Sequence, residues 1–197
     1  MRVILAEKPS VAQSIAAVLG ANQKKNGYLQ GENDIVSWCI GHLIELAPPE
    51  IYDARYAKWR REDLPIVPSA WESVVSDGTK KQFAVLKDLL NRTDVDEMVC
   101  ATDAGREGEL IFRMVYEKTG CTKPVKRLWI SSLEESAIRD GFRSLKLGTA
   151  YDALYRAALC RAQADWLVGI NGTRLYSRLY GTKLNVGRVM TPTLAMV

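Results

Sequence analysis

One feature of the sequence restricts the possible folds of this chain more than any other. It is a short apolar run that ends in a charged turn and leads into an amphipathic stretch. Residues 98–101 (Met-Val-Cys-Ala) have the length and apolar content of a buried strand. Thr102 and Asp103 follow, and their side-chain oxygens are suited to accept the free N–H groups of a helix start. A helix is predicted next, because apolar residues recur at helical spacing: Leu110, Ile111, Met114 and Val115. This order is typical of α/β folds, in which ligands bind at the carboxyl ends of strands.

The same order of strand, charged or polar turn and helix occurs again at the amino terminus and after residue 124. Residues 2–6 predict a short central strand, Glu7 and Lys8 follow it, and residues 9–20 predict a helix that starts at proline and ends at glycine. A further strand and helix are predicted at residues 125–130 and 133–145. Strands that alternate with helices predict an α/β fold with a parallel sheet flanked by helices.

Acidic side chains follow two of the predicted strands. Glu7 and Asp103 should lie at the same edge of the sheet, where the ends of parallel strands meet. Glu107 is four residues after Asp103, the spacing that puts two side chains on one helix face. Converging carboxylates are suited to bind a hard cation such as Mg²⁺. The alternative is structural, because acidic residues in a first helical turn complement the helix dipole and Glu7 can pair with Lys8 on the surface.

Composition argues against several other kinds of site. The four cysteines form no C-x-x-C pair, so a zinc site is not expected. They also form no evident disulfide framework, so the protein is expected in a reducing cytoplasm. His42, the only histidine, is interpreted as a structural hydrogen-bonding residue in preference to a catalytic one. No apolar run has the length of a secretory signal or of a bilayer span, so no membrane association is expected.

The pattern changes after Gly148, where residues 151–169 predict a helix and no further strand is indicated. We therefore expect two domains, residues 1–147 and residues 148–197, the second mainly helical. Basic side chains gather in residues 156–197, which carry six lysines or arginines and one acidic residue. This asymmetry indicates a polyanionic partner, most often nucleic acid, and a solvated helix face is the alternative.

Two features of this basic part are suited to phosphate groups. Arg174 and Arg178 are four residues apart, so they are expected on one face of a helix. Residues 187–193 combine a glycine, an arginine and hydroxyl groups near an expected helix start, where backbone N–H groups bind anions.

Three segments resemble one known family, and they occur in the family's order. They are Leu5-Ala6-Glu7-Lys8-Pro9-Ser10, Ala101-Thr102-Asp103-Ala104-Gly105-Arg106-Glu107-Gly108-Glu109 and Gly187-Arg188-Val189-Met190-Thr191-Pro192. Together they resemble the bacterial topoisomerase III family of type IA DNA topoisomerases. The first two segments resemble the Toprim module, and the third resembles a DNA-contacting motif of the next domain. The resemblance implies that residues 1–147 form a Toprim domain and residues 148–197 the truncated helical start of the DNA-binding core domain.

The resemblance also implies roles for single residues. Glu7 would be a catalytic residue near the scissile phosphate and a Mg²⁺ ligand, and Lys8 would contact that phosphate. Asp103 would be a second Mg²⁺ ligand and Glu107 the third acidic position. The expected contacts with single-stranded DNA are Gly187, Arg188, Val189, Met190, Thr191 and Pro192, and the charge pattern adds Arg174 and Arg178.

Two positions depart from the family's pattern. Many Toprim sequences have an acidic residue where Gly105 stands, so one Mg²⁺ held by Glu7 and Asp103 is expected here. The family's last motif usually has glutamine where Met190 stands, so one hydrogen bond is lost at that point.

The family's nucleophilic tyrosine would lie beyond Val197, since no tyrosine of this chain is in its motif. The chain is thus expected to be an amino-terminal fragment, inactive in cleavage by itself. The parent would break and reseal one DNA strand through a phosphotyrosine, relaxing or decatenating DNA without ATP. The expected partners are single-stranded DNA and the remaining domains, with no obligate protein partner, on the nucleoid in the bacterial cytoplasm. The alternatives are a Toprim nuclease or primase and a non-catalytic nucleic-acid-binding module.

Overall fold

The computed structural model describes residues 1–197, which form two compact units. The first unit consists of residues 1–45 and 75–158, and the second of residues 46–74 and 159–197. Helix α6 (Asp152–Tyr180) begins in the first unit and ends in the second. The units therefore interleave along the chain, whereas the domains expected from the sequence, residues 1–147 and 148–197, are contiguous, and that division stays a prediction.

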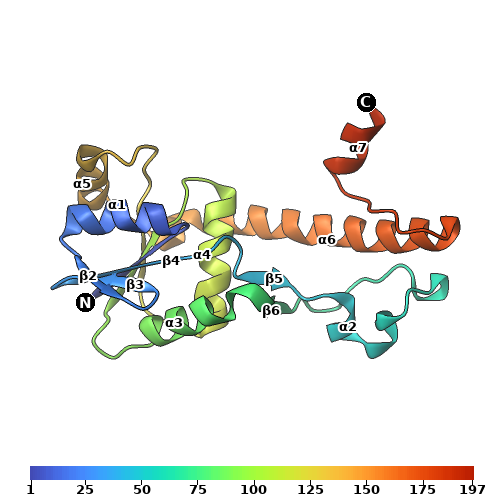
Figure 1. The fold of residues 1–197 in the computed structure, drawn as a ribbon, viewed down its shortest axis with the longest axis horizontal. Coiled ribbons are helices and arrows are strands. Elements are labelled where there is room, and N and C mark those ends of the chain that lie inside the picture. Colours follow the sequence, from blue (N-terminus) through green and yellow to red (C-terminus); the bar gives the residue numbers. More distant parts are fainter. The chain divides into compact units, whose positions relative to one another are not determined.

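The first unit is built around a seven-stranded mixed sheet (Figure 1). The strand order is β2-β3-β4-β1-β7-β8-β9. The strands are β1 (Arg2–Ala6), β2 (Gln23–Lys25), β3 (Tyr28–Gln30), β4 (Asp34–Trp38), β7 (Glu97–Ala101), β8 (Val125–Arg127) and β9 (Lys146–Leu147). β1 runs parallel to β4 and to β7, and β7 runs parallel to β8. The outer pairs are antiparallel.

Helices cover both faces of this sheet, which explains why its central strands are continuously apolar. The helices are α1 (Pro9–Leu19), α3 (Lys80–Leu90), α4 (Arg106–Thr119) and α5 (Glu135–Arg143). Ile4 and Ala6 of β1 pack in one core with buried residues of α1 and α5. Val3 and Leu5 alternate with them and point to the opposite face, where α3 lies and packs against α4 (Figure 1). The expected α/β fold with a sheet flanked by helices is confirmed.

The sheet differs from the expected parallel sheet at both edges, where the strand pairs are antiparallel. Residues 21–32 are mostly polar and show no strand pattern, yet they contain β2 and β3, which extend the sheet as an antiparallel meander. The turn between them uses Gly27 with a φ of 82°, a conformation that favours glycine. β2 carries Lys24 and Lys25 with all side chains exposed, so no apolar alternation marks it as a strand. At the other edge, β9 is also exposed and begins with Lys146.

A separate two-stranded sheet forms where the chain leaves the first unit and returns to it. It pairs β5 (Ile44–Leu46) with β6 (Ser73–Val75). The remaining short helical elements are α2 (Pro49–Tyr52), α7 (Met190–Ala195) and the 3₁₀ turns Ala54–Ala57, Arg61–Asp63, Asp77–Thr79 and Gly148–Tyr151. None of the helices combines the length and the apolar content that a membrane crossing requires.

Aromatic and amide contacts hold the second unit together around the later part of α6. The ring of Trp166 meets those of Tyr52 and Trp71 edge to face, with centroids 5.9 and 5.4 Å apart. The side chain of Asn171 accepts a hydrogen bond from the N–H of Ile66 and donates one to its carbonyl. These contacts fix residues 46–74 on α6 within this unit.

Candidate functional site

The ends of two neighbouring parallel strands bring Glu7, Lys8 and Asp103 together. β1 and β7 pair in register up to Ala6 and Ala101, so the residues that follow leave the sheet side by side. The N–H of Asp103 donates a hydrogen bond of 3.2 Å to Oε2 of Glu7. Nζ of Lys8 lies 3.8 Å from Oε1 of Glu7 and 3.6 Å from Oδ2 of Asp103. The two carboxylates thus share one ammonium group as their counter-ion.

The surroundings of the two carboxylates differ in their access to water. The side chain of Glu7 is 14% exposed, whereas those of Asp103 and Lys8 are each 57% exposed. Like charges so close together are unfavourable unless a cation compensates them, a role that Lys8 fills here. Carboxylate oxygens at an open strand end are the donors that Mg²⁺ accepts, with water completing its coordination. The donor set therefore fits Mg²⁺, and it fits soft metals poorly.

Glu107 is not part of this cluster, and the reason lies in where helix α4 begins. The expectation that Asp103 and Glu107 share a helix face was wrong, because α4 starts at Arg106 with Gly105 as its cap. The hydroxyl of Thr102 does not cap the helix but donates to the carbonyl of Gly108 at 2.7 Å. The carboxylate of Glu107 pairs instead with His42, whose Nε2 lies 3.0 Å from Oε1. No group of three or more carboxylate, histidine or cysteine side chains is placed so that it could hold a metal ion together.

The sequence interpretation missed the position of His42. This residue lies a few positions after β4, which is the parallel neighbour of β1, so it reaches the same edge of the sheet as Glu7. The available signal was the pair Gly41-His42 after an apolar strand, with Gly41 in a left-handed turn at a φ of 67°.

A buried arginine, also missed from the sequence, supports the loop that carries Asp103. The side chain of Arg127 on β8 is 0% exposed. Its Nη1 donates to the carbonyls of Thr102 (2.7 Å) and Cys100 (3.1 Å), and its Nη2 donates to the carbonyl of Asp103 (2.7 Å). Its Nε lies 3.2 Å from Oε2 of Glu109 without hydrogen-bond alignment. The sequence signal was a charged residue next to the apolar run Leu128-Trp129-Ile130 in the predicted strand 125–130, since a charge that is buried with such a run requires a partner.

Gly108 allows the loop to fold onto the start of α4. A Cβ atom at this position would lie 2.2 Å from the carbonyl oxygen of Asp103 and 2.9 Å from its nitrogen. Only glycine permits so close an approach of backbone to backbone. At Gly105, in contrast, a Cβ would meet nothing within 4 Å, and the backbone there is extended.

The predicted DNA-contacting segment lies in the second unit. Arg188 forms two bonds with Asp165, from Nε at 2.6 Å and from Nη2 at 3.2 Å, and this guanidinium lowers the pKa of the carboxyl group. The N–H of Gly187 donates to the hydroxyl of Thr191 at 2.9 Å. Val189 and Met190 are exposed, and Pro192 lies in the first turn of α7.

The chain that leads into this segment is attached to α6 by hydroxyl groups. Oγ1 of Thr173 accepts from the N–H of Val186, and Oγ of Ser177 accepts from the N–H of Leu184, both at 2.9 Å. Gly172 leaves room for this extended segment, because a Cβ there would lie 2.9 Å from the side chain of Val186. Two turns of α6 therefore fix the position of the segment within its unit.

The two arginines expected on one face of α6 have different surroundings. Arg174 is 4% exposed; its Nη1 donates to the carbonyl of Tyr56 at 2.6 Å and its Nη2 lies 3.3 Å from Glu50. Its guanidinium also lies over the ring of Trp59. Arg178 is exposed. Arg174 thus acts inside the unit, which leaves Arg178 as the available cation of the pair.

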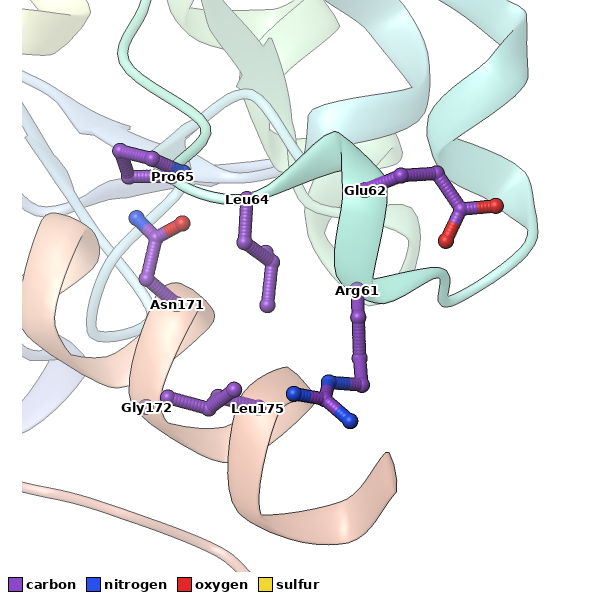
Figure 2. Close-up of a pocket in the computed structure, with 7 residues that line it drawn as sticks. All are labelled: Arg61, Glu62, Leu64, Pro65, Asn171, Gly172 and Leu175. Atoms are coloured by element: carbon purple, nitrogen blue, oxygen red, sulfur yellow. The ribbon is translucent and has the colours of Figure 1, made fainter. Parts of the chain in front are cut away.

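The second unit also contains a pocket of about 740 Å³ between residues 61–65 and α6 (Figure 2). Its lining includes the apolar side chains of Leu64, Pro65 and Leu175. The side chain of Asn171 also lines it, but its hydrogen bonds are made with the backbone of Ile66. Figure 2 shows the guanidinium of Arg61 directed toward α6 and the carboxylate of Glu62 directed away from it. The pocket includes none of the residues expected to bind metal or DNA.

Both the earlier and the later part of the chain match known protein families. Residues 2–133 match the Toprim domain family, and residues 149–197 match a family described as DNA topoisomerase. A protein named DNA topoisomerase 3 from Shouchella clausii is 55% identical over 196 residues, which cover 100% of this chain and 27% of that protein. Proteins of the same name from Bacillus licheniformis and Bacillus anthracis are 53% and 52% identical, each over 99% of this chain and 27% of theirs.

A solved structure resembles the fold. The full-length topoisomerase I from Thermotoga maritima superposes with a TM-score of 0.67 at 24% identity, covering 99% of this chain and 29% of that one. This chain spans about a quarter of the length of the relatives that it matches. Because the Toprim match covers about two thirds of the chain, the chain belongs to the Toprim domain family, and its last part matches the family described as DNA topoisomerase.

Proposed function

We propose that this chain supplies the Mg²⁺ site and part of the DNA-contacting surface of an enzyme that transiently breaks and reseals one DNA strand. The observation that carries the proposal is the cluster of Glu7, Lys8 and Asp103 at the ends of β1 and β7. Two carboxylates that each lie within 4 Å of one ammonium group are suited to a phosphodiester and a divalent cation. The match to DNA topoisomerases favours strand passage over simple hydrolysis. A chromosomal substrate would place the protein in the cytoplasm, on the nucleoid.

In this proposal Glu7 and Asp103 hold one Mg²⁺, which when bound neutralises charge on the phosphate oxygens. Glu7 is the less exposed ligand and its orientation is fixed by the N–H of Asp103. Glu107, paired with His42, is not assigned as a ligand.

Lys8 has a second role in the proposal. In the structure its ammonium group compensates both carboxylates. Once a cation compensates them instead, the half-exposed lysine is free to contact a phosphate oxygen, as the resemblance implies. Lys8 then positions the scissile phosphate, and a tyrosine from another part of the parent protein attacks it.

The proposed contact with single-stranded DNA is made by residues 187–192 together with Arg178. The exposed backbone and hydroxyl groups of this segment are suited to phosphates. Arg188 stays paired with Asp165 and presents the outer edge of its guanidinium. Arg174 is left out of the proposed contact because its donors are used within the unit.

The metal site is tested by titrating the chain with Mg²⁺ and with Mn²⁺. Calorimetry measures the binding, and electron paramagnetic resonance measures the binding of Mn²⁺. We expect Glu7→Gln and Asp103→Asn each to weaken binding at least tenfold, because each removes a charged ligand. Glu32→Gln removes an exposed carboxylate elsewhere in the same unit and serves as the matched control. Equal affinity in all four proteins would refute the site.

The DNA contact is tested by the salt dependence of binding to a single-stranded oligonucleotide. Arg178→Gln should weaken binding and reduce the slope of log K against log salt by about 0.7, the value for one phosphate contact on a single strand. Arg156→Gln removes an exposed arginine from the same helix but from the first unit, and should leave the slope unchanged. If both variants behave alike, the contact is not local to the second unit.

A further inference from the structure

We propose that the buried Arg127 is a positioning residue for the metal site, which holds the loop after β7 so that Asp103 faces Glu7. The inference rests on the proposed function of that site. Arg127 touches neither the cation nor the DNA in this proposal, and it acts through the backbone of residues 100–103.

The geometry of the guanidinium carries this inference. Both Nη atoms of Arg127 donate to carbonyls, and the three carbonyl acceptors belong to the loop and strand end that carry Asp103. One of them is the carbonyl of Asp103 itself, at 2.7 Å. The N–H of the same residue donates to Glu7. The backbone of Asp103 is thus bound on one side to the proposed ligand Glu7 and on the other to Arg127.

A buried charge network fixes the guanidinium in turn. Glu109 is almost fully buried and lies between two arginines, with Oε2 3.2 Å from Nε of Arg127 and Oε1 2.9 Å from Nε of Arg113. Arg113 also donates to the carbonyl of Gly148 at 2.7 Å and to Asp152 at 2.8 Å. The network therefore reaches the first residue of α6, and it contacts three separate segments of the first unit.

Packing alone does not explain this arrangement. A buried ion pair contributes little net stability, and apolar residues of similar volume often replace one without loss. Arginine supplies several donors in a rigid plane, which suits three carbonyls that diverge from one strand end. Residues that orient the ligands of a metal commonly alter its affinity 10- to 100-fold when they are changed.

Two variants separate positioning from folding. Arg127→Lys keeps the charge but loses the planar fork. The double variant Arg127→Met with Glu109→Met removes the pair while keeping its approximate volume, so it retains the fold where a single change would strand a buried charge. Arg139→Lys is the matched control, because Arg139 forms an exposed pair with Glu135 on α5. Each protein is measured for Mn²⁺ affinity and, without metal, for its thermal midpoint and circular dichroism.

We expect a 10- to 100-fold weaker Mn²⁺ affinity in the folded double variant, a loss of the same kind in Arg127→Lys, and no change in Arg139→Lys. Wild-type affinity in a folded double variant would overturn the positioning role. Asp103→Asn is measured in the same series to separate the two proposals. If it loses Mn²⁺ binding while the double variant does not, only the inference about Arg127 fails; if it binds like the wild type, the metal site and this inference both fail.

Discussion

Replacing Gly108 by alanine should damage the proposed metal site through the backbone. The new Cβ atom would lie 2.2 Å from the carbonyl oxygen of Asp103 and 2.9 Å from its nitrogen. Both are backbone atoms, so no side chain can turn away, and the loop must move by about 1 Å to restore an ordinary contact. This movement strains the bonds that Asp103 makes with Glu7 and with Arg127.

The size of the effect follows from opposing contributions. Overpacking at a tight contact costs about 1–3 kcal/mol. Each weakened hydrogen bond adds up to about 1 kcal/mol. Alanine in place of glycine within a helix stabilises the folded state by about 1 kcal/mol, which offsets part of this loss. We therefore expect the free energy of unfolding to fall by about 1–3 kcal/mol, together with a weaker affinity for Mg²⁺.

Gly105 provides the control within the same loop. It has an extended backbone and an open position for a Cβ, so Gly105→Ala should leave stability unchanged or raise it by up to about 1 kcal/mol. Urea unfolding of the three proteins, followed by circular dichroism, gives the free energies, and calorimetry gives the Mg²⁺ affinity. If Gly108→Ala unfolds at the wild-type midpoint and binds Mg²⁺ equally well, the close approach of loop and helix is refuted.

Three further outcomes can be measured on the same chain. Gly105→Asp should tighten Mg²⁺ binding severalfold in calorimetry, because the open position admits a third carboxylate; an unchanged affinity would place that carboxylate outside the site. Arg174→Gln should lower the free energy of unfolding by about 2 kcal/mol in urea, since it leaves Tyr56 and Glu50 without their buried partner. A maleimide at neutral pH should label Cys160 rapidly and the three buried thiols only on unfolding, as mass spectrometry of timed samples would report.

The buried thiols have a physical reason to be inert. Burial raises the pKa of Cys100 to about 11, so at neutral pH it is a protonated core residue. This agrees with its place in the apolar run 98–101, which the sequence predicts to be a buried strand.

The parts of the site that could be predicted are those set by strand order. Glu7 and Asp103 each follow an apolar strand, and parallel strands bring their carboxyl ends to one edge, so their proximity follows from two local patterns. The position of Glu107 could not be read this way. It depends on where α4 begins, and that is decided by the contact between Gly108 and Asp103 and by the hydroxyl of Thr102.

Other features depend on partners that are distant in the sequence. Arg174 looked like a surface cation because its helix is basic, but it is buried by residues 50–59, more than a hundred positions earlier. The network around Arg127 likewise joins β8, α4 and the start of α6, which no local periodicity connects. The exposed strand β2 escaped prediction because it carries no apolar pattern.

The outermost strands of the sheet determine how the protein should behave at high concentration. An open sheet ends in unpaired N–H and C=O groups, onto which another molecule could add a strand. Here β2 displays Lys24 and Lys25 and β9 displays Lys146, all of them exposed. A second copy that approached either border would set lysine against lysine, so charge repulsion keeps neighbouring molecules from joining their sheets into a continuous aggregate.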